Sequence, residues 1–161
     1  MEENKAIRED ILQSVGGYSD ERLNEKLDDG GWTIMQILEH LYLMESSIVH
    51  TISDQLVNGE NKTVEEKPIH LTTNRSRKFD ALSFVKPSNN FITLEEIQNK
   101  LSESRETLME VLESTDETLL EQRAYQHPSF GELSLKQWIP FIGLHEKRHL
   151  AQIEELKEKL A

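Results

Sequence analysis

The chain has 161 residues and no cysteine, which excludes disulfides, thiolate zinc sites and a cysteine nucleophile. This length suits one domain with a substantial core, and we predict a single domain over residues 1–161. The net charge of -12 disfavours binding to nucleic acid or to an anionic membrane, and indicates a charged, soluble surface. The sequence predicts neither a signal peptide nor a transmembrane segment, and we expect a cytoplasmic protein.

Two amphipathic helices are predicted in the first third of the chain. One covers about residues 5–15 and ends at a glycine pair, followed by a polar connection that contains a helical turn within 21–27. The next begins after Thr33, which pairs with Gln36 in a predicted capping box, and ends near residue 58. Its apolar stripe consists of Ile34, Ile37, Leu41, Met44 and Ile48. His40 lies beside this stripe.

Two further helices are predicted in the second half. One begins after Thr93, with a capping box to Glu96, and ends near residue 113. Ser104 is the one polar member of its stripe, and we expect it either in the core seam or facing a cavity. The last helix follows Ser134, ends near residue 160 and contains Pro140, which should bend it or break its first turn.

The connection between the second and third predicted helices, residues 59–93, has no long periodicity. A connection of this length can cross a bundle and leave the helices on either side parallel. We therefore predict an all-α, four-helix bundle with a long crossover. A weak strand pattern at residues 79–85 carries little weight.

The candidate site lies in the last helix, where His145 and His149 are one turn apart and face the same way. They occupy the apolar seam of that helix, in a three-four repeat. The seam consists of Leu135, Trp138, Ile142, His145, His149, Gln152 and Leu156. Buried imidazoles need partners, and a metal ion is a common one.

Residues 145–149 also match the H-E-x-x-H pattern of zinc proteases, in which Glu146 would be the general base. The extended form of that pattern fails, because Gln152 and Glu155 stand where glycine and histidine are required. We therefore expect Glu146 to face solvent. His40 is the better third ligand, and three imidazoles would leave a coordination position open for chemistry.

Two segments and the late histidines together resemble the DinB-like superfamily, which includes bacterial YfiT-type proteins. The segments are Trp32-Thr33-Ile34-Met35-Gln36-Ile37-Leu38-Glu39-His40-Leu41 and His127-Pro128-Ser129-Phe130-Gly131-Glu132-Leu133-Ser134-Leu135-Lys136-Gln137-Trp138. They are followed by His145, His149 and Gln152-Ile153. The resemblance extends from residue 18 onward and is weakest at residues 59–93.

The resemblance implies a four-helix bundle, often a homodimer, that binds a divalent metal through a histidine triad. Carried over by position, the triad is His40, His145 and His149. Relatives include thiol-dependent S-transferases that use bacillithiol or mycothiol, and a mycothiol-dependent isomerase. The metal's identity is not readable from the sequence; zinc or nickel is favoured, with iron or manganese as alternatives.

We therefore predict a metal-dependent thiol S-transferase or hydrolase acting on a small molecule, with a low-molecular-weight thiol as a candidate cofactor. The alternatives are a non-catalytic metal- or ligand-binding stress-response protein, and a purely structural bundle. No general base can be named.

The remaining polar and aromatic candidates have simpler interpretations. We expect a loop or packing role for His127 and surface positions for His50 and His70. Gln152 is a candidate for orienting His149, and Trp138 for walling the site. We also expect Trp32 and Phe141 in the core, and Lys147 and Arg148 pointing outward.

Overall fold

The computed structural model describes residues 1–76 and 81–161. Four long helices form its frame: α1 (Glu2–Val15), α3 (Ile34–Asn58), α4 (Leu94–Glu113) and α6 (Leu135–Leu160). The shorter elements are α2 (Asp20–Leu23), η1 (Ile69–Thr73), η2 (Ser83–Val85), α5 (Glu117–Glu121), β1 (Ala124–His127) and β2 (Gly131–Ser134). The predicted four-helix bundle is confirmed, and both predicted capping boxes are present.

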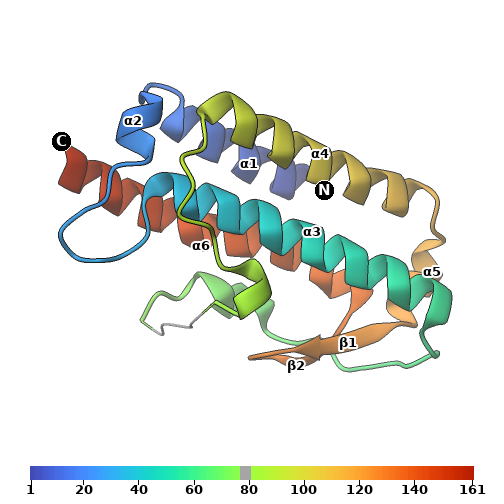
Figure 1. The fold of residues 1–161 in the computed structure, drawn as a ribbon. Coiled ribbons are helices and arrows are strands. Elements are labelled where there is room, and N and C mark those ends of the chain that lie inside the picture. The colour runs from blue at the N-terminus through green and yellow to red at the C-terminus, as the bar shows by residue number, and fades with distance from the viewer. Residues whose placement is uncertain (77–80) are drawn as a thin grey trace.

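The helices form two layers, with α3 and α6 in one and α1 and α4 in the other (Figure 1). α3 and α4 run in the same direction, opposite to α1 and α6. This confirms the long crossover, because two parallel neighbours cannot be joined by a short turn. Along the crossover, η1 packs on α6 and η2 packs on α3.

The weak strand pattern at residues 79–85 is not a strand where the structure describes it. Residues 79 and 80 lie outside the described residues, and Ser83–Val85 forms the η2 turn.

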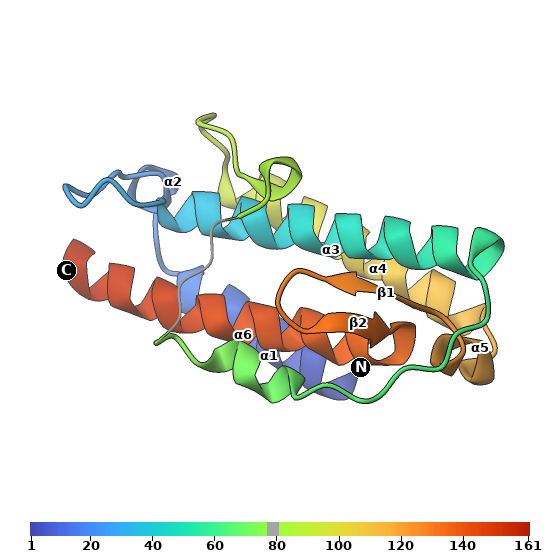
Figure 2. The ribbon, with the colours of Figure 1, turned by 90° about the horizontal axis from the view of Figure 1, so that it is seen from below.

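A two-stranded hairpin was not predicted. β1 and β2 pair antiparallel, with Tyr125 opposite Leu133 and His127 opposite Gly131. Gly131 has a φ of 77°, which a side chain would disfavour, so glycine permits the tight return of the chain. The hairpin lies across α3 and α6, on the side away from α1 and α4 (Figure 2).

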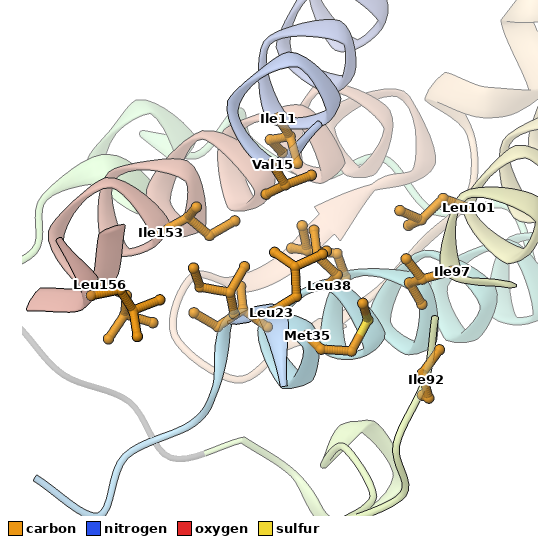
Figure 3. Packing of buried hydrophobic residues seen from close by; sticks show 14 residues of the cluster. Ile11, Val15, Leu23, Met35, Leu38, Ile92, Ile97, Leu101, Ile153 and Leu156 are labelled. Atoms are coloured by element: carbon orange, nitrogen blue, oxygen red, sulfur yellow. The ribbon is translucent and has the colours of Figure 1, made fainter. Parts of the chain in front are cut away.

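The core is divided into two apolar clusters along the bundle. One combines side chains of α1, α2, α3, α4 and α6 (Figure 3). The other joins α3 and α4 to α5, the hairpin and the first turns of α6. Between them each long helix contributes a charged side chain: Arg8, Glu45, Arg105 and Glu146.

This charged layer corrects the prediction that Glu146 faces solvent, because its side chain is only 1% exposed. Arg8 donates to both oxygens of Glu146, at 2.9 and 2.8 Å, and to Glu45 at 3.1 Å. Arg105 donates to Glu45 at 2.7 Å and to Glu146 at 3.0 Å. Burial alone would lower the pKa of Arg8, but the carboxylates of Glu146 and Glu45 raise it above its ordinary value. Ser104 also lies in this layer and donates to Glu45 at 2.5 Å, so it fills the seam rather than facing a cavity.

α1 packs closely against α6 at Gly143. A Cβ atom there would collide with the side chain of Asn4, including its Cγ at 2.9 Å. The Asn4 amide donates to the carbonyl of Ile139, just before Pro140, at 2.9 Å. α6 continues through Pro140, so of the two expected outcomes a broken first turn is excluded. None of the described helices combines the length and hydrophobicity that a membrane span requires.

Candidate metal centre

The structure brings together the three histidines that the sequence singled out. His40 comes from α3, and His145 and His149 come from successive turns of α6. One ring nitrogen of each lies within 4.8 Å of the others, and the Nε2 atoms of His40 and His145 are 3.1 Å apart. The separation of the imidazoles is therefore small enough for one ion to contact all three.

Outer hydrogen bonds orient two of these rings. Nδ1 of His40 lies 2.8 Å from the carbonyl oxygen of Val85, and Nδ1 of His149 lies 2.8 Å from Oε1 of Gln152. Because both partners are acceptors, each Nδ1 carries the proton and each Nε2 presents its lone pair. The contact between Gln152 and His149 that the expected orienting role requires is present. Such outer bonds fix the tautomer of histidines that ligate metals.

All three imidazoles are neutral at pH 7. Burial lowers the pKa of His40, and it lowers the pKa of His145 well below its ordinary value. The pKa of His149 is lowered to about 3, mainly by burial and to a smaller extent by the repulsion that a charged His40 would exert. Metal binding would therefore displace few protons from the ligands, which removes a usual cost of binding near neutrality.

Aromatic rings pack against two members of the triad. Trp32 packs against His40 with ring centroids 5.0 Å apart, and Phe141 lies 5.9 Å from His145. Phe141 is buried as expected, whereas Trp32 is only half-buried. Trp138 packs against Phe141 with ring centroids 5.4 Å apart, so it contacts a ring that lines the site.

The other candidates take the following positions. His127 is buried and packs in the hairpin, as predicted, and His50 and His70 are exposed. Lys147 is exposed, but Arg148 is half-buried and donates to the carbonyls of Thr72 and Asn74 at 3.1 and 2.7 Å. Arg148 thereby ties η1 to α6, which the sequence did not indicate.

The donor set fits a divalent transition metal. Three neutral imidazole nitrogens suit zinc, nickel, copper or iron, and hard cations such as calcium and magnesium prefer oxygen. In the described part of the chain no carboxylate joins the cluster. Glu146 cannot act as the base of a zinc protease here, because it faces the charged layer and pairs with Arg8 and Arg105. Three protein ligands leave at least one position for water or a small molecule.

The comparisons with known proteins agree with this architecture. A family model of the DinB superfamily matches residues 3–153, and the chain belongs to that superfamily. The uncharacterized protein YuaE of Bacillus subtilis (strain 168) is 38% identical over 153 residues, which cover 95% of this chain and 94% of YuaE.

Two solved structures share the fold. YfiT from Bacillus subtilis, described as a probable metal-dependent hydrolase with an unusual four-helix bundle topology, superposes with a TM-score of 0.67 at 18% identity. That match covers 98% of this chain and 83% of YfiT. The four-helix bundle protein TT2238 gives a TM-score of 0.63 at 21% identity, covering 96% of this chain and 94% of TT2238.

Proposed function

We propose that this protein is a metal-dependent enzyme that binds one divalent ion through His40, His145 and His149 and acts on a small molecule. A bound ion would lower the pKa of a coordinated water or thiol and so supply a nucleophile at neutral pH. The observation that carries the proposal is the convergence of three neutral imidazoles, two of them fixed by outer hydrogen bonds.

The burial of the three histidines favours a site that binds a ligand over a core in which the rings only pack together. Neutral imidazoles that direct their unprotonated nitrogens toward one another inside a protein are costly without a shared cation or proton. Among the described residues, the one hydrogen bond within the triad joins Nε2 of His40 to Nε2 of His145, at 3.1 Å. The description of YfiT as a probable metal-dependent hydrolase supports hydrolysis. The resemblance to thiol-dependent DinB-like transferases supports thiol transfer.

The first experiment is elemental analysis of untagged protein, with His149→Ala and His50→Ala beside the wild type. His50 lies on α3 and is exposed, so His50→Ala is the matched control. We expect about one metal ion per chain in the wild type and in His50→Ala, and a large loss in His149→Ala. Absence of metal after reconstitution, with an equal or higher melting temperature in His149→Ala, would refute the proposal and favour a structural bundle.

The reaction class is tested on the metal-loaded protein. Turnover of model esters and amides without added thiol supports a hydrolase. Turnover of electrophiles that requires bacillithiol or a similar thiol supports an S-transferase. Stoichiometric binding without turnover supports the non-catalytic alternative, a metal- or ligand-binding stress-response protein. We also propose a homodimer, which light scattering coupled to size-exclusion chromatography tests.

A further inference from the structure

His127 presents a hydrogen-bond donor that none of the described residues accepts. Its Nδ1 accepts from the backbone N–H groups of Ser129 at 2.9 Å and Phe130 at 3.2 Å. Because Nδ1 is an acceptor in both bonds, the proton of the neutral ring must be on Nε2. Burial lowers the pKa of His127 to about 4, so the ring is neutral at pH 7.

The surroundings of His127 are apolar. Its ring contacts Phe130, Trp138 and Phe141, with centroids 5.0, 5.2 and 4.6 Å away. The residue is 8% exposed, and Nε2 is not among its fully enclosed atoms; within the described part of the chain no hydrogen bond from Nε2 is found. Nε2–H is therefore accessible and lies in apolar surroundings, so the oxygen of a bound ligand is a suitable partner for it.

The position of His127 indicates where that partner lies. Phe141 contacts both His127 and His145, at 4.6 and 5.9 Å between ring centroids. The hairpin that carries His127 lies on the α3 and α6 side of the bundle, the helices that carry the triad (Figure 2).

We propose that Nε2–H of His127 donates a hydrogen bond to an oxygen of the small molecule held at the open position of the triad. This inference rests on the proposed metal site and narrows its substrate class to molecules with a carboxylate, carbonyl or phosphoryl oxygen near the reacting atom. His127 is thus a positioning residue, placed by the turn that follows β1.

Two substitutions separate this role from a purely structural one. His127→Asn keeps an acceptor near the position of Nδ1, so it preserves the turn bonds of Ser129 and Phe130 but removes the distal donor. His127→Gln loses the proximal acceptor but places an amide N–H near the position of Nε2. If His127 has only a structural role, His127→Asn should leave stability and ligand binding unchanged, and His127→Gln should reduce both. The proposed role predicts the reverse for ligand binding.

The test uses the cobalt-loaded protein and acetate as the probe ligand, followed by the visible absorption of Co²⁺. We expect both variants to bind Co²⁺ like the wild type. Acetate affinity should fall roughly tenfold or more in His127→Asn and stay within about threefold of the wild type in His127→Gln. Ethanethiol, which has no oxygen acceptor, should bind all three proteins equally.

The failures are distinguishable. Wild-type protein that does not bind Co²⁺ refutes the metal site, and the His127 inference with it. Normal Co²⁺ binding with unchanged acetate affinity in His127→Asn, or with equal losses in both variants, overturns the His127 inference alone. If either variant does not fold, NMR of the zinc-loaded wild type decides: acetate should shift the Nε2 proton of His127, and an unmoved signal overturns the inference.

Discussion

Replacing Arg8 by methionine would remove one of the two guanidinium groups that compensate the buried carboxylates of Glu45 and Glu146. The substitution deletes two bonds to Glu146, one to Glu45 and one to the carbonyl of Leu101, all between 2.8 and 3.1 Å. Glu146 would keep a single bond, from Arg105 at 3.0 Å. A buried carboxylate would then be poorly compensated.

Removing one partner of a buried ion pair costs about 3–5 kcal/mol of unfolding free energy. In a chain of this size each kcal/mol changes the melting temperature by about 2–4 °C, so we expect Arg8→Met to melt about 6–20 °C lower. Lys62→Met is the control, because Lys62 forms an exposed ion pair with Glu132, and such pairs contribute less than about 1 kcal/mol.

The assay is urea unfolding with a thermal melt of the wild type, of the single variants Arg8→Met, Glu146→Gln and Lys62→Met, and of the double variant Arg8→Met/Glu146→Gln. Replacing Glu146 as well neutralises the charge that Arg8→Met leaves unpaired, so the double variant should recover part of the loss, with a coupling of about 1–3 kcal/mol. Equal stability of Arg8→Met and Lys62→Met, or strict additivity in the double variant, would refute this account of the charged layer.

Three further outcomes are expected. Gly143→Ala should lower the free energy of unfolding by about 1–3 kcal/mol, because the new Cβ collides with Asn4. Gly17→Ala is the control, because nothing lies within 4 Å of a Cβ at that position. Equal melting temperatures of the two variants would contradict this prediction. Gln152→Leu should weaken metal binding about 10–100-fold, because it removes the hydrogen bond that orients His149. Competition with a chelator dye measures the affinity, and an affinity equal to that of the wild type would exclude the orienting role. In the metal-free protein, His149 has a pKa of about 3 when folded and an ordinary value of 6.5 when unfolded. Between these two pH values His149 is protonated in the unfolded chain but not in the folded one. The free energy of unfolding should therefore fall in that window as pH is lowered, by up to about 1.4 kcal/mol per pH unit for this group, and a slope unchanged in His149→Ala would rule it out.

The sequence predicted the elements whose signals are local and periodic. The helix boundaries at Thr33, Thr93 and Ser134 depend on caps a few residues away, and the structure has those caps. The clustering of His145 and His149 follows from helical spacing alone. Their meeting with His40 depended on a resemblance and on the assumption that both helices face one interior.

The features that were missed depend on contacts between distant residues. Glu146 was assigned to solvent because one buried face per helix was assumed, but α6 contacts α1, α3, α5, η1 and β2 and so is covered on several sides. Its partner Arg8 is 138 residues away in sequence, with no local signal. The hairpin escaped prediction because its strands have only four residues each and depend on packing such as the stacking of Tyr125 on Trp138.

The carbonyl that orients His40 belongs to Val85, in the crossover between α3 and α4. The same segment is held to α3 by Ser88, whose N–H and hydroxyl donate to Glu39 at 3.0 and 3.1 Å. A metal bound at the proposed site would therefore favour this conformation of the crossover, and by thermodynamic reciprocity whatever stabilises the crossover would strengthen metal binding by the same factor. Phe84 is 63% exposed beside Val85, so a molecule that docks on Phe84 and stabilises η2 would tighten metal binding from outside the site.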